Sequence, residues 1–549
     1  MDDATRVEWR EWGEDAFAEA RERGVPVLLS LTATWCEPCH EMDAQTYADP
    51  AIAAHIGDSF VPVRVDVDRQ PRVRDRYAMG GFPSTVFLTP DGSLLTGGGY
   101  FDPDGLRQVL ERVRETWRER GTDAGRIPRA LREREPPAGD LDETVERLVL
   151  AALEGTHDEV AGGWGEAPKF PLPGALEFAL KRDRAMALRS FEAVRANLLD
   201  EYEGGFYRFA SERDWSGLHT EKLTDENAAL LRAFANAYLS TGDPASLAPA
   251  ERTLEYLTTT LWLPEENAFA ASQAGGDPKT PTLTASDREA VSTPPVDETV
   301  FAGANALAVD ALLTYAAYTD DERATRYAVR ALETLRERLL EDGAVVHYRA
   351  DGRAGERTLL TNQARVLRAL LTAHSVCGPD GVPGALEDAR RVAAVALEEL
   401  REDSGAFVDG PTEGPGLLER PLRPIDGAAE LANALVDLSV VIGEERYRET
   451  AHDALAAFAG ASDRLGAPVA GYATAVSRLR SGPLVVRVGT PAGTDLHRAA
   501  FRLADHEKVV VPASDALESG TARVEHGSRV SSPATTPAEL SERVSTVLE

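Results

Sequence analysis

The sequence predicts a multidomain protein with an α/β domain at its N-terminus, an all-α middle region and a small α/β region at its C-terminus. Three observations predict this division. Apolar runs of strand length alternate with helical patterns in residues 1–118, helical patterns follow one another through residues 141–481, and strand-length runs return in residues 482–549. Residues 119–140 are charged and punctuated by Pro and Gly, and they are predicted to be a linker.

In the N-terminal domain, the predicted elements have the order of a βαβ unit followed by a hairpin. Helices are predicted at residues 14–23, 71–77 and 104–118, and strands at residues 25–31, 60–66, 85–88 and 94–98. The first strand is followed at once by Thr34–His40 (TWCEPCH), as expected for a turn from a strand into a helix.

Cys36 and Cys39 give this turn a candidate redox chemistry. A cysteine at the start of a helix lies close to unpaired backbone N–H groups and to the positive end of the helix dipole, which favour the thiolate form. A second cysteine one turn later can resolve a mixed disulfide. Cys36 is therefore the predicted nucleophile and Cys39 the predicted resolving cysteine.

The same letters fit other kinds of site. Cys-x-x-Cys-His is also an attachment signature of c-type haem, and Cys36, Cys39 and His40 could instead be three zinc ligands or structural residues without a reactive role. Residues 1–17 contain no apolar signal core, which disfavours haem attachment. The third cysteine, Cys377, lies in a distant helical pattern, which disfavours zinc. We expect no metal and no other cofactor.

The charge of the chain limits its partners. The formal net charge is -32, from 91 acidic and 59 basic residues, which disfavours nucleic acid and anionic membranes. A surface adapted to high salt explains this charge better than a basic partner does. Because no apolar run approaches the length of about 18 residues that a membrane span needs, we expect a soluble, cytoplasmic protein whose cysteines rest reduced.

A further motif leads into the third predicted strand. Gly80–Phe87 (GGFPSTVF) and the cysteine motif together resemble the thioredoxin fold. The resemblance implies that the peptide bond before Pro83 is cis and that Pro83 faces the cysteines. Thioredoxins carry a buried acid six positions before the first cysteine, where this chain has Ser30.

The middle region is predicted to contain twelve helices, a number that suits six helical hairpins. They are placed at residues 142–153, 174–187, 190–199, 224–240, 249–261, 299–317, 324–340, 361–373, 386–401, 427–441, 445–459 and 468–479. Turns with an aromatic residue recur between paired helices, and polar segments precede alternate helices, as is typical of a closed helical repeat. Each polar segment alone is also explained by helix capping.

Two stretches fall outside the helical repeat. Residues 270–297 are too long for a plain connection, and we expect a mobile flap or a disordered segment there. In the C-terminal region, strands are predicted at residues 484–488 and 508–511, and helices at residues 495–504 and 537–548.

Several motifs, in order, resemble the family of spermatogenesis-associated protein 20, also described as domain of unknown function 255. They are Cys36–Met42 (CEPCHEM), Phe87–Gly92 (FLTPDG), Gly162–Pro171 (GGWGEAPKFP), His219–Leu223 (HTEKL) with Asn227–Ala228, and Asp297–Asn305. The resemblance implies a thioredoxin-like domain followed by an (α/α)6 toroid related to glycosidases and sugar epimerases. The toroid site that it implies contains Trp164, Lys169, His219, Glu221, Lys222, Glu226, Asn227, Asp297 and Asn305.

The sequence leaves three functional hypotheses. The first is a thiol-disulfide oxidoreductase or redox-sensing module in which Cys36 and Cys39 react with protein thiols, disulfides or a redox partner, and Pro83 borders the substrate groove. The second is a carbohydrate-active enzyme whose toroid acts on a sugar ligand through carboxylates or a histidine base. The candidate carboxylates are Glu221, Glu226, Asp297, Glu298, Asp426 and Glu430, and the candidate bases are His219 and His347. The third is a non-catalytic binding scaffold.

Overall fold

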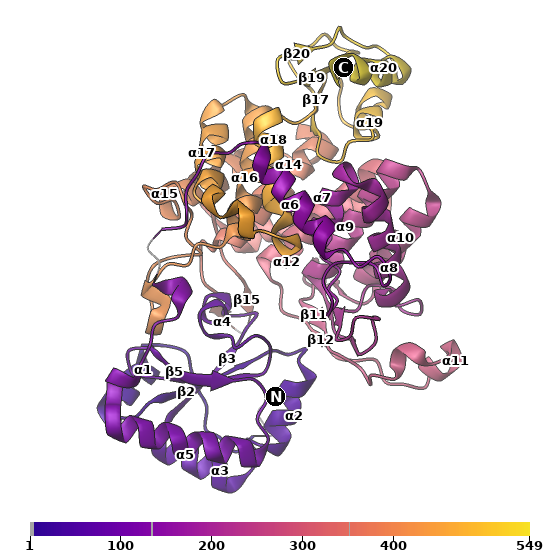
Figure 1. Ribbon diagram of the computed structural model, residues 1–549. Helices are drawn as coiled ribbons and strands as arrows, with labels where there is room; N and C mark the ends of the chain where they lie inside the picture. The colour runs from indigo at the N-terminus through magenta and orange to yellow at the C-terminus, as the bar shows by residue number, and fades with distance from the viewer. Residues whose placement is uncertain (1–4, 133–134, 351, 549) are drawn as a thin grey trace. The chain divides into compact units, whose positions relative to one another are not determined.

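The computed structural model describes residues 5–132, 135–350 and 352–548, and these form two compact units (Figure 1). The first unit consists of Met1–Arg134 and Asp409–Leu422, and the second of Glu135–Val408 and Arg423–Glu549. Asp409–Leu422, which lies within the range expected for the toroid, thus belongs to the first unit.

The first unit is built on a five-stranded mixed sheet in the order β1-β3-β2-β4-β5. Its strands are β1 (Arg10–Glu11), β2 (Val27–Thr32), β3 (Val61–Asp66), β4 (Ser84–Leu88) and β5 (Leu94–Gly98). Its helices are α1 (Glu14–Arg23), α2 (Glu37–Gln45), α3 (Pro50–Ser59), α4 (Pro71–Tyr77) and α5 (Pro103–Arg120). β2 runs parallel to β3 and antiparallel to β4, and α3 packs against α5. This arrangement confirms the predicted thioredoxin-like α/β domain.

Local sequence explains most of these elements. All six residues of β2 are buried, as expected for a central strand that is mostly apolar. Asp49 caps α3 by accepting hydrogen bonds from the backbone N–H groups of Ala51 and Ile52, and Pro50 occupies the first helical position. Helix α3, which was not predicted, packs Ile52 and Ile56 into the core because they lie one turn apart.

The first half of the predicted linker is ordered within the first unit. Helix α5 continues to Arg120 and is followed by two 3-10 turns, η1 (Gly121–Ala124) and η2 (Arg129–Leu131). Between them, Arg126 exchanges two backbone hydrogen bonds of 2.8 and 2.9 Å with Leu94 of β5. The segment therefore extends the edge of the sheet.

The insertion Asp409–Leu422 is held to α4 by buried charges. The guanidinium groups of Arg72 and Arg76 both donate to Asp409, at 3.3 and 2.6 Å, and the two arginine side chains are 3% and 0% exposed. They also donate to backbone carbonyl groups of the insertion at Leu417, Leu418 and Arg420. Buried ions require such pairing, because a lone charge in this position would be strongly destabilising.

The second unit contains a ring of paired helices. Its inner helices are α7 (Pro173–Arg182), α9 (Thr224–Thr241), α12 (Ala302–Thr319), α14 (Leu360–Gly381), α16 (Ile425–Ile442) and α18 (Ala470–Ser481). Each inner helix packs on the next in this order, and α18 packs back on α7, which closes the ring. The outer helices are α6 (Glu143–Thr156), α8 (Arg184–Leu198), α10 (Pro244–Thr259), α13 (Glu322–Thr334), α15 (Ala385–Glu399) and α17 (Glu445–Ala456). The predicted (α/α)6 toroid is thus confirmed.

Short strands line the turns of the toroid. They are β6 (Phe209–Ala210), β7 (Leu218–His219), β8 (Lys222–Leu223), β9 (Trp262–Leu263), β10 (Ala268–Phe269), β11 (Ser272–Gln273), β12 (Val296–Asp297), β13 (Leu340–Glu341), β14 (Ala344–Val345), β15 (Arg349–Ala350) and β16 (Arg353–Ala354). Residues 270–297, expected to be a flap or disordered, include β11, a 3-10 turn (Thr280–Thr282), α11 (Ala285–Arg288) and β12. This segment is therefore a folded excursion between two paired strands.

The C-terminal region forms a four-stranded sheet in the order β18-β17-β19-β20. Its elements are β17 (Val485–Val488), α19 (Asp495–Phe501), β18 (Val509–Val511), β19 (Ala522–His526), β20 (Arg529–Val530) and α20 (Pro537–Leu548). The predicted small α/β region is confirmed, with β19 and β20 as additional strands. Across the described ranges, no helix combines the length and apolar character that crossing a membrane requires.

Candidate functional site

The cysteine motif lies where β2 passes into α2. Cys36 is the N-cap residue of α2, and Cys39 lies in the first turn of that helix. A disulfide joins the two sulfur atoms, and the backbone N–H of Cys39 donates a hydrogen bond of 3.2 Å to Cys36 Sγ. After reduction, this N–H and the positive end of the α2 dipole would stabilise the thiolate of Cys36, which is the nucleophilic form.

Trp35 packs beside the cysteines and is held from two sides. Its Nε1 donates a hydrogen bond of 2.7 Å to Asp68. Its ring packs edge-to-face with that of Phe82, and the two ring centres are 6.0 Å apart. Asp68 and Phe82 come from the segments that follow β3 and precede β4. The motif is therefore fixed by contacts from both strands that flank β2.

Pro83 lies at the same edge of the sheet as the cysteines. β2 and β4 pair antiparallel with Leu31 opposite Ser84, so Pro83 precedes β4 at the edge where β2 ends and Cys36 follows. The peptide bond between Phe82 and Pro83 is cis.

The position of the missing acid holds a hydroxyl group. Ser30 is 3% exposed in β2 and lies opposite Thr85, whose hydroxyl is 3.1 Å from the hydroxyl of Tyr47. A serine hydroxyl does not ionise near neutral pH as a carboxyl group does, so proton transfer at Cys39 requires another group or solvent.

Lys169 is buried in the turn between α6 and α7. Its ammonium group donates hydrogen bonds to Asp158 Oδ2 at 3.1 Å and to the carbonyl oxygens of Gly162 and Gly165 at 3.2 and 2.6 Å. Arg213, whose side chain is 58% exposed, donates to the same carboxylate at 2.7 and 3.1 Å. Together with other hydrogen bonds, Arg213 holds the pKa of Asp158 well below its usual range.

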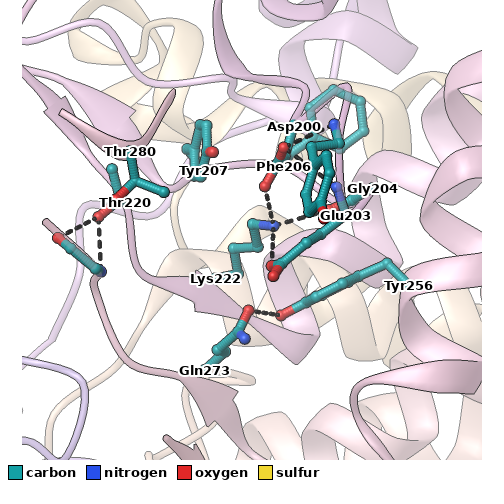
Figure 2. A network of polar contacts seen from close by, with 12 residues as sticks. Asp200, Glu203, Gly204, Phe206, Tyr207, Thr220, Lys222, Tyr256, Gln273 and Thr280 are labelled. Atoms are coloured by element: carbon teal, nitrogen blue, oxygen red, sulfur yellow. Dashed lines mark hydrogen bonds and ion pairs between the residues drawn. The ribbon is translucent and has the colours of Figure 1, made fainter. Parts of the chain in front are cut away.

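Lys222 lies in an equivalent turn between α8 and α9. Its ammonium group donates to Asp200 Oδ2 at 2.8 Å and to the carbonyl oxygen of Gly204 at 2.9 Å, and it lies 3.6 Å from Glu203 (Figure 2). Arg288 of α11 donates to the same oxygen of Asp200 at 2.8 Å. Burial acts to raise the pKa of Asp200, but the two cations lower it to about 2. Burial lowers the pKa of Lys222, although Asp200 acts in the opposite direction.

Asn227 and Asn305 form hydrogen bonds with the backbone of the turns that precede their helices. The Asn227 amide group accepts from the backbone N–H of Phe206 at 2.6 Å and donates to its carbonyl at 3.2 Å. Asn305 does the same to Phe269 at 2.8 and 2.9 Å, and Gln363 binds the next turn in a similar way. The geometry gives these buried amides a structural role in the repeat.

His219, Glu221 and Glu226 are brought together by a residue that the sequence did not suggest, Arg208. Its guanidinium group donates to Glu221 and Glu226, both at 3.4 Å, and His219 Nδ1 lies 3.7 Å from Glu221. Burial raises the pKa of Glu226 to about 8, and the neighbouring charge of Asp225 adds to this effect against the opposing influence of Arg208.

Three further candidate residues have the following surroundings. Trp164 is 3% exposed in the hydrophobic core. Asp297 accepts a hydrogen bond of 3.0 Å from the backbone N–H of Thr299. His347 Nδ1 lies 3.0 Å from Asn362 Nδ2.

A cavity of about 500 Å³ runs through the ring between the inner helices. Arg365 lies in its wall and donates to Glu430 at 3.0 Å, with Asp225 at 3.6 Å. Asp426 and Glu430 belong to the first turns of α16 and also line the cavity. Burial raises the pKa of Asp426 to about 6, and the charge of Glu430 adds to the increase.

A network of ion pairs crosses the deeper part of the same cavity. It consists of Arg232–Glu177, Arg232–Asp310, Arg368–Asp310, Arg368–Asp437 and Arg478–Asp437. Burial alone would raise the pKa of Asp310, but Arg368 and Arg232 lower it to about 2. Charges on all six inner helices thus neutralise one another around the axis.

The C-terminal region contributes the far end of this cavity. Residues 506–510 line it beside the C-terminal parts of α12 and α18. Glu507 accepts from Arg182 at 2.7 Å, and the ammonium group of Lys508 lies 5.2 Å from the ring centre of Tyr318. Burial lowers the pKa of Lys508 to about 7.

Sequence reasoning missed the ion-pair network, although a signal was present. Its members interrupt otherwise apolar stretches of the inner helices, as Asp310 does in AVDALL and Asp437 does in LVDLSV. A single charge within a buried helical face requires a partner of opposite charge from a neighbouring helix. Such isolated charges, compared across the predicted helices, would have indicated the network.

Comparisons with known proteins find several similar sequences and structures. Residues 2–133 match the family model Thioredox_DsbH, described as a protein of unknown function, DUF255. Spermatogenesis-associated protein 20 of Homo sapiens is 30% identical over 310 residues, which cover 50% of this chain and 39% of the human protein. The chain therefore spans well under half the length of this relative. The predicted resemblance to that family is confirmed over these regions.

Two further similarities concern the separate parts. The thiol:disulfide interchange protein DsbD 1 of Pseudomonas aeruginosa is 36% identical over 105 residues, which cover 18% of each chain. The structure of cellobiose 2-epimerase from Spirochaeta thermophila is 17% identical, with a TM-score of 0.46, and the match covers 57% of this chain and 84% of the epimerase.

Proposed function

We propose that Cys36 and Cys39 carry out thiol–disulfide exchange with protein or small-molecule thiols. The observation that carries this proposal is the position of Cys36 Sγ at the N-cap of α2, where the N–H of Cys39 lies 3.2 Å away. Pro83 lies at the same edge of the sheet and would border the groove that receives the substrate. The similarity of the N-terminal residues to a thiol:disulfide interchange protein supports the same chemistry.

In the reductive direction, the Cys36 thiolate attacks one sulfur of a substrate disulfide. A mixed disulfide forms, and the other substrate sulfur leaves as a thiolate that takes a proton from solvent. The Cys39 thiolate then attacks Cys36 Sγ, so that the Cys36–Cys39 disulfide forms and the second substrate thiolate leaves. Two electrons pass from the dithiol to the substrate, and an external thiol reductant restores the dithiol.

Turnover of a disulfide substrate by the full chain tests this proposal. With insulin as substrate and dithiothreitol as reductant, Cys36→Ser is expected to lower the rate to the uncatalysed background. Cys39→Ser is expected to accumulate an insulin-chain adduct on Cys36, visible by mass spectrometry. Cys377→Ser is the matched control and should leave the rate unchanged, because burial raises the pKa of that thiol to about 11. A wild-type rate in Cys36→Ser would exclude the proposal.

A second proposal concerns the axial cavity of the toroid, for which we propose a sugar ligand. The volume of the cavity, about 500 Å³, supports this proposal. Charged side chains of its wall are paired with one another, so the wall offers polar groups to a neutral ligand. Asp426, whose pKa is raised to about 6, would be the proton donor or acceptor of such a site near neutral pH. Saturation-transfer NMR with a panel of neutral sugars tests it, with Glu430→Gln expected to weaken the signals. The absence of any sugar signal that depends on Glu430 would contradict it.

A further inference from the structure

A second cavity, of about 370 Å³, lies beside Lys222. Lys222 of β8 and Gln273 of β11 line it, together with the turn after α8 and the excursion between β11 and β12. Within the described ranges, it shares no lining residue with the axial cavity. It is therefore a separate site from the one at the centre of the ring.

Gln273 provides an unsatisfied polar group in this cavity. It lies directly opposite Lys222 in the pairing of β11 with β8 and is 2% exposed. Its Oε1 accepts a hydrogen bond of 3.0 Å from the hydroxyl of Tyr256, whereas its Nε2 has no partner among the described residues (Figure 2). Turning the amide over would leave Oε1 unpaired instead, because a tyrosine hydroxyl can bond either atom. Buried amide groups are nearly always hydrogen-bonded, so this atom points to a ligand group.

The buried charges around the cavity are already paired, and the other charged residue of its lining, Glu289, is exposed. Lys222 is neutralised by Asp200 at 2.8 Å and Glu203 at 3.6 Å, and Arg288 donates to the same Asp200 oxygen. Lys222 and Arg288 are both cations, and Asp200 and Glu203 are both anions, so the group carries no net charge. An ionic ligand would have to displace one of these pairs, whereas an uncharged ligand would not.

Apart from Gln273, the uncharged polar side chains that line the cavity are hydroxyls. Thr280 Oγ1 is buried and has no hydrogen-bond partner among the described residues. The hydroxyl of Tyr207 accepts from Arg288 at 3.2 Å and stays protonated, since burial raises the pKa of Tyr207. Ser292 and Thr293 add two more hydroxyl side chains to the lining. Such a set of neutral donors and acceptors matches a ligand that carries several hydroxyl groups.

We propose that this cavity binds a neutral, hydroxyl-rich molecule of about the size of a monosaccharide. The amide of Gln273 and the hydroxyl of Thr280 bond ligand hydroxyls, and the Lys222–Asp200–Arg288 cluster fixes the walls. Arg288 and Thr280 both belong to the excursion between β11 and β12, so this segment covers the ligand.

The proposal is tested by saturation-transfer NMR on the full chain with glucose, mannose and galactose. The expected result is a signal from at least one sugar that Thr280→Val and Gln273→Met each weaken by about tenfold, the effect of losing one well-placed hydrogen bond. Glu430→Gln weakens only signals that arise in the axial cavity, so the signal scored here is the one that persists in that variant. Glu192→Gln, which alters an exposed ion pair with Arg195 outside both cavities, is the matched control and should leave this signal in place. Thr280→Val replaces a hydroxyl by a methyl group of similar size, so it decides the outcome if Gln273→Met disturbs folding.

Three results would overturn the proposal. The first is that the cavity holds no sugar. NMR would show this as no signal from any of the sugars, and crystals grown at saturating sugar would show ordered water alone beside Gln273. The second is a signal that survives Thr280→Val and disappears in Glu430→Gln, which would place the sugar in the axial cavity. The third is tighter binding of gluconate than of glucose, which would show that the site selects an anion.

Discussion

The two units of this protein carry their chemistry in different ways. In the first unit, Cys36 and Cys39 lie three residues apart, and a single helix start orients them both. In the second unit, each charged group of the axial network finds its partner on another helix, as Arg232 of α9 does with Glu177 of α7 and Asp310 of α12. The redox site is therefore a local feature, whereas the axial network exists only when the ring is closed.

This difference has a consequence for substitutions. A change at the cysteine motif removes a reactive group and leaves the packing of the first unit almost intact. A change in the axial network leaves a buried charge without its partner, and the cost falls on the stability of the second unit. Substitutions in the two units should therefore separate activity from stability.

The largest effect on stability is expected from Asp310→Ala. This carboxylate is 1% exposed and pairs with both Arg232 and Arg368, so its loss leaves two guanidinium groups uncompensated. The free energy of unfolding should fall by about 3 to 5 kcal/mol, measured by urea denaturation of the full chain. Asp495→Ala, which removes an exposed ion pair with Arg498, is the control and should cost less than about 1 kcal/mol. Equal effects of the two changes would contradict the collective role of the network.

Asp409→Ala tests whether the stability of the first unit depends on the distant insertion Asp409–Leu422. Arg72 and Arg76 both depend on this carboxylate, although it is supplied by a segment more than 300 positions later in the chain. We expect the first unit to lose about 3 kcal/mol of stability, seen as faster hydrogen exchange in α4. Asp75→Ala, which removes an exposed pair with Arg74, should leave this exchange unchanged. If α4 exchanges equally slowly in both variants, the insertion does not support the first unit.

The two lysine turns offer a matched pair of substitutions. Arg288→Ala removes a cation that is 6% exposed from Asp200, whereas Arg213→Ala removes one that is 58% exposed from Asp158. Because Arg288 is buried, Arg288→Ala should lower the free energy of unfolding by about 1 to 3 kcal/mol. Arg213→Ala should lower it by less than about 1 kcal/mol. Thermal unfolding of the two variants under one condition measures the difference. A larger loss of stability in Arg213→Ala than in Arg288→Ala would contradict the view that burial sets the cost.

The smallest effect is a pH dependence in the second unit. Because the pKa of Glu226 is raised from 4.5 to about 8, the folded chain holds a proton that the unfolded chain releases. The stabilisation is present below about pH 4.5 and is lost as the pH rises toward about 8. The side chain is 33% exposed, so screening by solvent reduces the slope. Glu226→Gln should flatten the dependence of the urea midpoint on pH over this interval, and parallel curves for the two proteins would contradict the assignment.

The helices and strands predicted from sequence patterns are those whose formation depends on residues close together in the chain. Helix α4 was predicted with its observed bounds, because Pro71 sets its start and the helical pattern ends at Tyr77. Hydrophobic periodicity placed the twelve toroid helices, since each buries one face in the ring. Helix α3 was missed, although Asp49 at its N-cap and Pro50 at its first position are local signals of a helix start.

The features that could not be predicted depend on contacts between distant residues. Nothing in the local pattern around Asp409 shows that it pairs with Arg72 and Arg76 of the first unit. Lys169 and Lys222 were noticed because lysine is rare in this chain, but their partners Asp158 and Asp200 became visible only in the folded turns. The candidate toroid site was likewise predicted as one group. In the structure, Asn227 and Asn305 hold turns, Lys169 and Lys222 lie in two separate turns, His219, Glu221 and Glu226 lie around Arg208, and Trp164 lies in the core.

The reactivity of Cys36 in the reduced full chain tests the central claim most directly. The measurement is the rate of alkylation of Cys36 by iodoacetamide as a function of pH, followed by mass spectrometry, with Cys377 as the internal reference. The account predicts that Cys36 reacts with a midpoint below the value of about 8.5 that an unperturbed cysteine shows, and faster than Cys377 at neutral pH. A midpoint at or above that value, with no advantage over Cys377, would contradict the assignment of Cys36 as the nucleophile.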